Sequence, residues 1–327
     1  MTREPCQVSV VEAAYLRAAT EAAWLHEIVT AALPLISDGL GAMACIYYGA
    51  TGPLRAGPYA AIDLAVPPAM FTETLERQEP AFVDRTWRSL SFGTCSETVK
   101  LSTLAKPMVD AGVQDILNIN AYDPSGIGVW LGAPLRKERT RRPNEAETWT
   151  RVAAHLGSAF RLRRRGTLAP APDQATAVLE TTGRIAHACS GAAADRLRDT
   201  LHDAVVRMER ARGPMRRRDP DGAVKTWRTL VDAELTLLDH FERGGKRYIV
   251  AVANPPSTSA PGLASLPARE RQVAVAAATG RSNKLIGYEL GLADSTVRVL
   301  LARSARRLGA RSRRELVAII RAHTGRQ

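Results

Sequence analysis

The organisation of this chain is clearest from the stretch GRSNKLIGYELGLADSTVR, residues 280–298. Gly280 ends a preceding helical pattern, and a second, short helix spans 282–290, beginning at a serine whose hydroxyl is suited to a helix start. Residues 291–294 then supply a turn that opens with Gly291, because glycine readily adopts the backbone conformations of tight turns. Another helix follows from Ser295. The pattern predicts two helices joined by a tight turn.

The sequence on either side extends this pattern to a small all-helical domain. A helical pattern at 266–279 precedes the stretch, and the helix that begins at Ser295 continues to Leu308, where Gly309 breaks it. Ser312-Arg313-Arg314-Glu315 is a capping box, in which serine and glutamate side chains each accept a hydrogen bond from a backbone N–H at the helix start. It opens a fourth helix that reaches Ala322. The predicted domain covers residues 262–327.

The third helix of this domain has two faces of different chemistry when residues are spaced at about 100°. The side expected to pack on the preceding helices is formed by Val297, Leu301, Ser304 and Leu308. The opposite side is formed by Ser295, Val299, Ala302 and Arg306, with Arg298 and Arg303 flanking them. Arginine forks pair with guanine edges in the major groove, and small apolar groups contact the thymine methyl. The second face is therefore suited to reading duplex DNA.

The basic charge of the chain is concentrated in the same region. The whole chain has a net charge of +12, and residues 261–327 contain 13 Lys and Arg against 4 Asp and Glu, a net of +9. The first 260 residues therefore account for only +3, the difference between +12 and +9. Such an excess in one small module is typical of a domain that binds a polyanion. Charge alone does not distinguish nucleic acid from an anionic membrane surface.

The spacing of this region resembles the LuxR-type helix-turn-helix over some 55 residues. The matching elements are Arg269-Glu270, Gly280-x-Ser282-Asn283-Lys284-x-Ile286, Leu290-Gly291-Leu292, Ser295-Thr296-Val297-Arg298 and Arg307-Leu308-Gly309. The resemblance implies that the third helix enters the major groove and that the fourth contributes to dimerisation. It implies base-edge contacts from Arg298, Val299 and Ala302. The full predicted interface is Ser282, Asn283, Lys284, Ser295, Thr296, Arg298, Val299, Ala302, Arg303 and Arg306, of which the first three would contact the DNA backbone.

The sequence also departs from the LuxR pattern at several positions. Ala293 stands where a capping serine is usual, so either Asp294 caps the third helix or the cap is weakened by about 1 kcal/mol. Gly287 replaces a usual alanine, at a similar cost within a helix. Leu285 and Leu300 occupy positions that are normally polar. We expect these leucines to pack on each other or on another domain.

The remainder of the chain predicts two α+β domains with antiparallel strands. Residues 1–168 are expected to contain a helix at 12–33 that stops at Pro34, a strand at 43–48, a hairpin of strands at 116–122 and 128–133, and a helix at 145–164. Turn residues at 123–126 favour the hairpin. The hairpin and the helix after it are similar to the second half of a GAF domain, a small-molecule sensor fold.

The middle segment, residues 172–254, lies between two proline-containing breaks at 169–172 and 254–262. It is expected to contain strands at 177–179 and 184–188, helices at 192–212 and 222–231, and a hairpin of strands at 234–241 and 247–252. This order resembles a PAS-like module. The predicted fold class is multidomain α+β, with antiparallel-sheet, sensor-like domains followed by an all-α, four-helix LuxR-type domain.

No residue pattern indicates an enzyme or a cofactor. Cys6, Cys45, Cys95 and Cys189 form no CxxC-type pair, and we expect reduced, mostly buried thiols. The six histidines make no pair at metal-ligand spacing, and no base–nucleophile–orienter set can be assembled. We therefore expect no catalytic residues, no metal and no cofactor. No apolar window reaches the length of a membrane span, and no secretory signal is visible, so a cytoplasmic location without a membrane partner is expected.

These observations favour a one-component transcriptional regulator whose partner is double-stranded DNA. We expect a homodimer, with a small-molecule or protein signal acting at the N-terminal domains. A sigma-factor-like protein is an alternative, because region four of sigma factors uses a similar helix-turn-helix. A second alternative is a sensor or enzyme whose basic C-terminus docks on a protein or membrane.

Overall fold

The computed structural model describes residues 4–50, 52–78, 82–83, 86–98, 106–139, 142–166, 168, 175–188, 197–243, 245–255 and 263–324. The chain divides into two compact units, Met1–Gly157 and Ser158–Gln327. The first unit contains one antiparallel sheet with helices, and the second contains another antiparallel sheet and a group of C-terminal helices. The coarse prediction of α+β parts with antiparallel sheets followed by a helical domain is confirmed. The predicted break at 169–172 and residues 256–262 of the break predicted at 254–262 lie outside the described residues.

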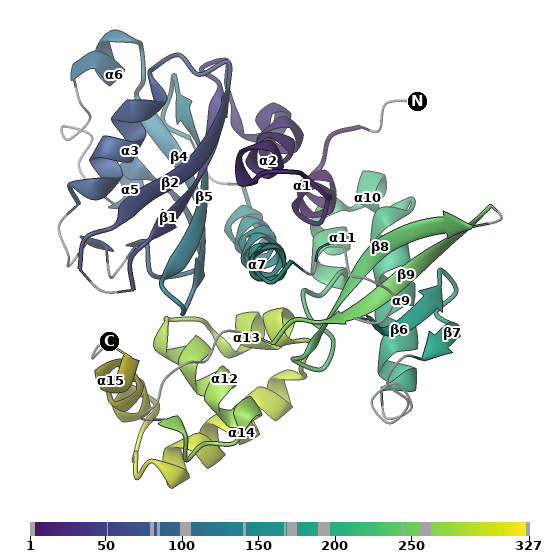
Figure 1. Ribbon diagram of the computed structural model, residues 1–327. Coiled ribbons are helices and arrows are strands. Elements are labelled where there is room, and N and C mark those ends of the chain that lie inside the picture. The colour runs from purple at the N-terminus through teal and green to yellow at the C-terminus, as the bar shows by residue number, and fades with distance from the viewer. Residues whose placement is uncertain are drawn as a thin grey trace. The chain divides into compact units, whose positions relative to one another are not determined.

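The sheet of the first unit has the strand order β2-β1-β5-β4-β3, and every neighbouring pair is antiparallel (Figure 1). Its strands are β1 (Ala42–Tyr48), β2 (Arg55–Ile62), β3 (Ser91–Thr94), β4 (Asp115–Asp123) and β5 (Ile127–Leu135). β4 and β5 form the predicted hairpin, and Gly126 in its turn has a φ of 86°, which glycine adopts without strain. β1 is also present where the sequence indicated a strand. β2 and β3, which occupy the two edges, were not predicted.

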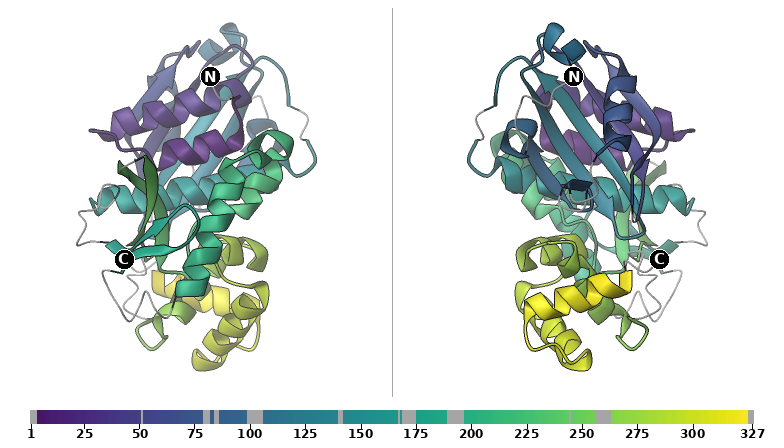
Figure 2. Two further views of the ribbon diagram at one scale, coloured as in Figure 1. Left: turned by 90° about the vertical axis from the view of Figure 1, so that its right-hand side faces the viewer. Right: turned by 90° about the vertical axis from the view of Figure 1, so that its left-hand side faces the viewer.

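Helices cover both faces of this sheet (Figures 1 and 2). The helices of the unit are α1 (Gln7–Ala14), α2 (Glu21–Ile36), α3 (Pro68–Glu76), α5 (Cys95–Thr98), α6 (Lys106–Asp110) and the start of α7 (Glu145–Arg164). α3 brings Phe71 to Trp130 of β5, with ring centroids 5.7 Å apart. All nine residues of β5 are buried, because a sheet covered on both faces has no solvent-facing side.

The predicted single helix at 12–33 is wrong, because the chain forms two helices there. α1 ends at Ala14, and α2 begins after Thr20, whose hydroxyl accepts a hydrogen bond from the backbone N–H of Ala23 at 3.1 Å. Pro34 does not stop α2 but lies within its last turn. Pro34 lacks the N–H that would bond to the carbonyl of Thr30, and the helix ends two residues later at Ile36.

The described cysteines are free thiols. Cys6 and Cys45 are buried, and Cys95 is half-buried. Burial raises the pKa of the Cys45 thiol to about 12 and that of Cys95 to about 11. Both thiols are therefore protonated and weakly reactive at neutral pH. Cys189 lies outside the described residues.

The second unit is built on a sheet with the order β7-β6-β9-β8, again antiparallel. Its elements are β6 (Ala175–Glu180), β7 (Ile185–Ala188), α9 (Arg198–Arg212), α10 (Met215–Arg218), α11 (Pro220–Thr226), β8 (Leu235–Arg243) and β9 (Lys246–Ala253). The predicted hairpin is present as β8 and β9. α9 is joined to it by ion pairs from Arg212 to Asp239 and from Glu209 to Arg247. The predicted residues 192–196 of α9 lie outside the described chain.

The predicted helix at 222–231 is wrong at both ends. α11 begins at Pro220 after Asp219, whose carboxylate accepts a hydrogen bond from the backbone N–H of Gly222. It ends at Thr226, and the chain then leaves the helix to form a turn in which Asp232 and Ala233 have positive φ angles of 49° and 63°. This turn returns the chain to β8 and contacts the C-terminal helices.

The C-terminal helices pack around a single apolar core. They are α12 (Ala268–Ala278), α13 (Asn283–Leu290), α14 (Asp294–Arg307) and α15 (Arg313–Thr324). Val273, Ile286, Val297, Leu316 and Ile320 are among the fully buried residues that bring these helices together. Over the described residues, none of the helices is both long and apolar enough to span a membrane.

Candidate nucleic-acid interface

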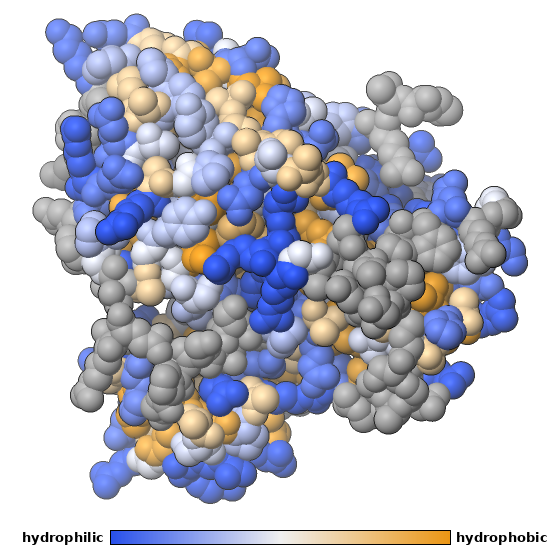
Figure 3. Space-filling view, in the orientation of Figure 1, coloured by the Kyte–Doolittle hydropathy of each residue, from blue (hydrophilic) through white to orange (hydrophobic). Residues whose placement is uncertain are grey.

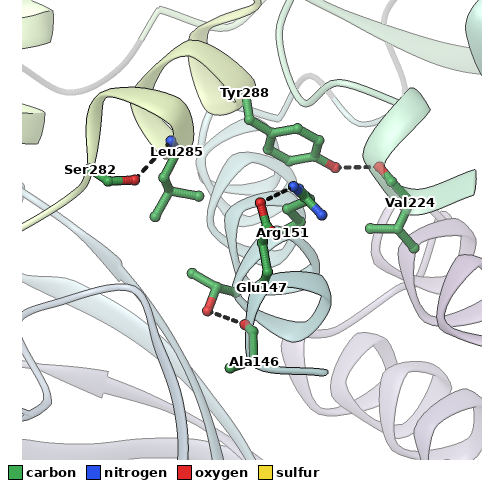
Figure 4. Close-up of polar contacts among 8 residues, drawn as sticks. Ala146, Glu147, Arg151, Val224, Ser282, Leu285 and Tyr288 are labelled. Atoms are coloured by element: carbon green, nitrogen blue, oxygen red, sulfur yellow. Dashed lines mark hydrogen bonds and ion pairs between the residues drawn. The ribbon is translucent and has the colours of Figure 1, made fainter. Parts of the chain in front are cut away.

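α13 and the turn after it are fixed by local hydrogen bonds. Ser282 caps α13, since its hydroxyl accepts a hydrogen bond from the N–H of Leu285 at 3.2 Å (Figure 4). Gly291 ends the helix with a φ of 69°, in the left-handed region that favours glycine. The N–H of Leu292 donates to the carbonyl of Gly287 at 2.9 Å, and a Cβ at Gly287 would lie 2.9 Å from the carbonyl oxygen of Leu292. The close approach of the turn explains this glycine.

α14 separates a buried side from an exposed side. Val297 and Ser304 are fully buried, Leu301 is buried beside them, and Leu308 is half-buried, which matches the packing side expected from the sequence. The Ser304 hydroxyl donates to the carbonyl of Leu300 at 2.9 Å, so its polarity is satisfied inside the core. The exposed residues include Ser295, Thr296, Arg298, Val299, Ala302, Arg303 and Arg306. All predicted contact residues of this helix therefore lie at the surface.

The predicted backbone-contact residues gather at the start of α13. Ser282 and Lys284 are exposed, and Asn283 is half-buried. The side-chain carbonyl of Asn283 accepts a hydrogen bond from the guanidinium of Arg313 at the start of α15, which ties the two helix starts together. In the space-filling view, the lower end of this helical domain is largely hydrophilic (Figure 3).

The unusual residues of the sequence have specific places. Ala293 is the N-cap of α14 and makes no side-chain cap, and Asp294 does not replace it. Instead, the Asp294 carboxylate pairs with Arg298 one turn later, with Oδ2 and Nη2 2.6 Å apart. Leu300 is buried in the core of the C-terminal helices, whereas Leu285 is half-buried. The core that holds Leu300 also includes Leu230 and Ala233 of the middle segment, so it is not confined to the C-terminal helices.

Two ion pairs that sequence analysis missed hold the helices in register. Arg281 Nε lies 3.0 Å from Glu289 Oε2, and both side chains are buried. Arg307 Nε lies 3.0 Å from Glu270 Oε2, which links the end of α14 to the first turn of α12. Because each pair joins the domain's own elements, these arginines are not available for DNA in the way that the exposed arginines of α14 are.

The sequence of this helical part is similar to that of known regulators. Residues 264–320 match the luxR family of bacterial regulatory proteins. The match covers the luxR-type domain and leaves the sheet-containing parts unassigned. No curated protein matches the chain.

The luxR-type domain is also docked on the middle part of the chain through α13. The hydroxyl of Tyr288 donates a hydrogen bond to the carbonyl oxygen of Val224, 2.8 Å away (Figure 4). It also lies 2.8 Å from the carbonyl oxygen of Trp227. The N–H of Ala233 donates to the carbonyl of Leu290 at 2.6 Å, and the guanidinium of Arg228 donates to that of Leu292 at 3.1 Å. We call this contact between residues 224–234 and the luxR-type domain the joint.

Apolar and charged contacts extend the joint. Leu230 and Ala233 are fully buried in the same core cluster as the luxR-type helices. A Cβ at Gly291 would lie 2.1 Å from the carbonyl oxygen of Leu230, so the two backbones meet directly. Arg269 forms an ion pair with Asp232 and lies 3.6 Å from Glu234.

One ionisable group of the joint, Arg228, has a shifted pKa. Burial, followed by the nearby guanidinium of Arg207, lowers the pKa of Arg228. No periodicity or motif in the sequence indicates these contacts, because residues 224–234 are some 60 positions away from α13 and their pairing depends on the tertiary fold.

Proposed function

We propose that the chain is a sequence-specific, DNA-binding transcriptional regulator of the one-component type that reads the major groove with α14. The observation that carries this proposal is the division of α14, whose apolar side completes the core while its other side presents arginine, hydroxyl and small apolar groups. Those groups match the donors and acceptors of base edges and the thymine methyl. The luxR-family match at 264–320 supports the same assignment.

In this proposal, base edges are contacted by Arg298, Val299 and Ala302. Backbone phosphates are contacted by Ser282, Asn283 and Lys284. Ser295, Thr296, Arg303 and Arg306 complete the interface. A start-of-helix position suits phosphate contact at Lys284, because the positive end of the helix dipole favours an anion there.

The sheet-containing parts are proposed as a GAF-like domain and a PAS-like domain that receive a small-molecule or protein signal, without enzymatic activity. Their antiparallel sheets with covering helices support this assignment. We propose that the regulator acts in the cytoplasm as a homodimer, so that the spacing of its DNA half-sites follows the geometry of the dimer. The joint is the part of the structure through which the middle domain can affect α13 and the turn before α14.

A comparison of Arg298→Ala with Lys284→Ala tests the DNA assignment. The full-length protein is first presented with random duplexes at physiological salt, and the selected sequence is used to measure affinity. Arg298→Ala is expected to lower affinity and relax preference at one base pair, at a cost of about 1–3 kcal/mol. Lys284→Ala is expected to weaken binding to all duplexes alike and to reduce the salt slope by about one.

The same experiment can overturn the proposal. A wild-type protein that retains no duplex, or that selects no sequence, contradicts the proposed function. Binding to anionic vesicles but not to duplex DNA would support membrane docking by the basic C-terminus instead. Equal losses on every sequence for both variants would contradict the separate roles of Arg298 and Lys284.

A further inference from the structure

One carboxylate lies at the edge of the surface that α14 presents. Asp294 is the first residue of the helix, and its Oδ2 lies 2.6 Å from Nη2 of Arg298. The two side chains are 43% and 72% exposed, respectively, so the pair is at the surface rather than in the core. Four residues of helix separate them by about 40° around the axis, which puts both on the border of the exposed side.

The arginines on this side of α14 are not equivalent. Arg298 is held by Asp294, whereas Arg303 and Arg306 form no ion pair or hydrogen bond within the described part of the chain. Arg307 is directed away from this side by its pair with Glu270. Arg298 is therefore the one arginine of the exposed side whose guanidinium is oriented by a carboxylate in the described structure.

Stability gives little reason for the Asp294–Arg298 pair. Exposed ion pairs one helical turn apart contribute only tenths of a kcal/mol. Asp294 makes no cap, since Ala293 is the N-cap residue and has no side-chain hydrogen bond. A negative charge in the first turn interacts favourably with the helix dipole, but any acidic residue in that turn would do so. The direction of the Arg298 guanidinium is the more specific consequence of the pair.

We propose that Asp294 is a specificity-determining residue that positions Arg298 for one guanine. This assignment rests on the proposed function. The guanidinium has five N–H donors in a rigid fork, so one edge can pair with Asp294 while the other donates to O6 and N7 of guanine. The negative charge of Asp294 also repels backbone phosphates, which keeps Arg298 from taking a sequence-independent contact.

The proposal predicts opposite changes in affinity and in discrimination. Asp294→Ala removes a negative charge that faces DNA, so affinity for unselected duplex is expected to rise about twofold to tenfold. Discrimination between the selected base pair and its substitutes is expected to fall about tenfold, because a correctly placed bidentate contact accounts for differences of that order. Freed from Asp294, Arg298 can contact a phosphate, so the salt slope is expected to steepen by up to about one.

The experiment uses the full-length protein with the duplex that the wild type selects and with duplexes substituted at each position. Asp294→Asn keeps the size of the side chain and removes its charge, and Asp294→Ala removes both. Asp199→Ala is the matched control, because Asp199 is an exposed, first-turn aspartate of α9 outside the luxR-type domain. Thermal unfolding of each variant reports whether α14 remains folded.

A double-mutant cycle gives a readout that a purely structural role would not change. In an Arg298→Ala background, Asp294→Ala is expected to cause no further loss of discrimination, because the residue that Asp294 positions is absent. If the wild type selects a sequence and Asp294→Asn selects the same sequence equally sharply, the proposed role of Asp294 is overturned. The proposed function of the protein would still stand. A wild type that selects no duplex overturns both the proposed function and the assignment that rests on it.

Discussion

The luxR-type domain has two contact surfaces of opposite character. The exposed side of α14 carries charged and hydroxyl groups, of which Arg303 and Arg306 have no protein partner within the described chain. The joint, on α13 and the turn after it, is buried, and its polar atoms are paired with residues 224–234. A surface with unpaired donors is suited to an external partner. A buried surface whose donors and acceptors are paired is instead suited to holding two parts of the protein in a fixed arrangement.

The two surfaces are therefore expected to have different roles: the exposed side of α14 in DNA binding, and the joint in regulation. Changes on the α14 side should alter affinity and base preference while leaving the fold intact. Changes at the joint should alter the stability of the helix-turn-helix and its connection to the middle domain. The residues that contact DNA, and the base preference, should stay the same. The proposed signal would act through the second surface, because the backbone of Leu230 contacts the turn that precedes α14.

Gly291→Ala should have the largest effect at the joint. Its Cβ would lie 2.1 Å from the Leu230 carbonyl oxygen, and the residue would keep a positive φ of 69°. Left-handed strain and overpacking together are expected to cost about 2–5 kcal/mol. Hydrogen exchange of the α13 and α14 amides measures the loss as reduced protection.

Gly309→Ala is the matched control for this substitution. Gly309 has a similar φ of 70°, but its Cβ would meet no atom of the described chain within 4 Å. Only the conformational strain of about 1–2 kcal/mol is expected. Equal losses of protection for the two variants would mean that the contact between Gly291 and Leu230 does not form in solution.

Tyr288→Phe should have an intermediate effect. It removes the hydrogen bond that the hydroxyl donates to the carbonyls of Val224 and Trp227 while keeping the ring in place. Leaving buried carbonyls unpaired is expected to cost about 1–3 kcal/mol. The variant should retain the base preference of the wild type, because Tyr288 is buried and on a different helix from the predicted base contacts.

Tyr59→Phe provides the control, since Tyr59 is 48% exposed and water can replace its hydroxyl's partners. Its unfolding free energy should stay within about 0.5 kcal/mol of the wild type. A Tyr288→Phe variant with unchanged amide protection but altered base preference would place Tyr288 on the DNA side and contradict the comparison of the two surfaces.

The exposed side of α14 could be predicted from the sequence, whereas the joint could not. Glycines, caps and apolar positions follow one another within 280–309, so local rules fix the helix ends and the buried side of α14. The Asp294–Arg298 pair was not predicted, although acidic and basic residues four apart on a helix are neighbours, because Asp294 was considered only as a cap. Its presence became clear only when Ala293, and not Asp294, proved to be the N-cap.

The missed features depend on contacts between distant segments. The edge strand β2 contains Gly57 and Pro58, which weaken any strand signal, and β3 has only four residues. The helix expected at 222–231 ends early because Leu230 and Ala233 are drawn into the core of the luxR-type domain, a tertiary contact that overrides local helical periodicity. The LuxR pattern places Leu300 at a position that is normally polar, whereas the structure buries it in the core.

The ion pair of Arg269 with Asp232 should contribute least, and its salt dependence can separate it from the rest of the joint. Both side chains are partly exposed, and such pairs contribute about 0–1 kcal/mol. Arg269→Gln should therefore lower the protection of the α12 amides slightly at low salt and hardly at all at about 1 M salt, where the screening length is only about 3 Å. The loss in Tyr288→Phe should persist at both salt concentrations, because a neutral, buried hydrogen bond is not screened.

Arg77→Gln, which breaks an exposed pair with Glu73, is the control and should change amide protection at neither salt concentration. An Arg269→Gln loss that is large and independent of salt would show that the joint depends on charge more than on its buried hydrogen bonds and packing.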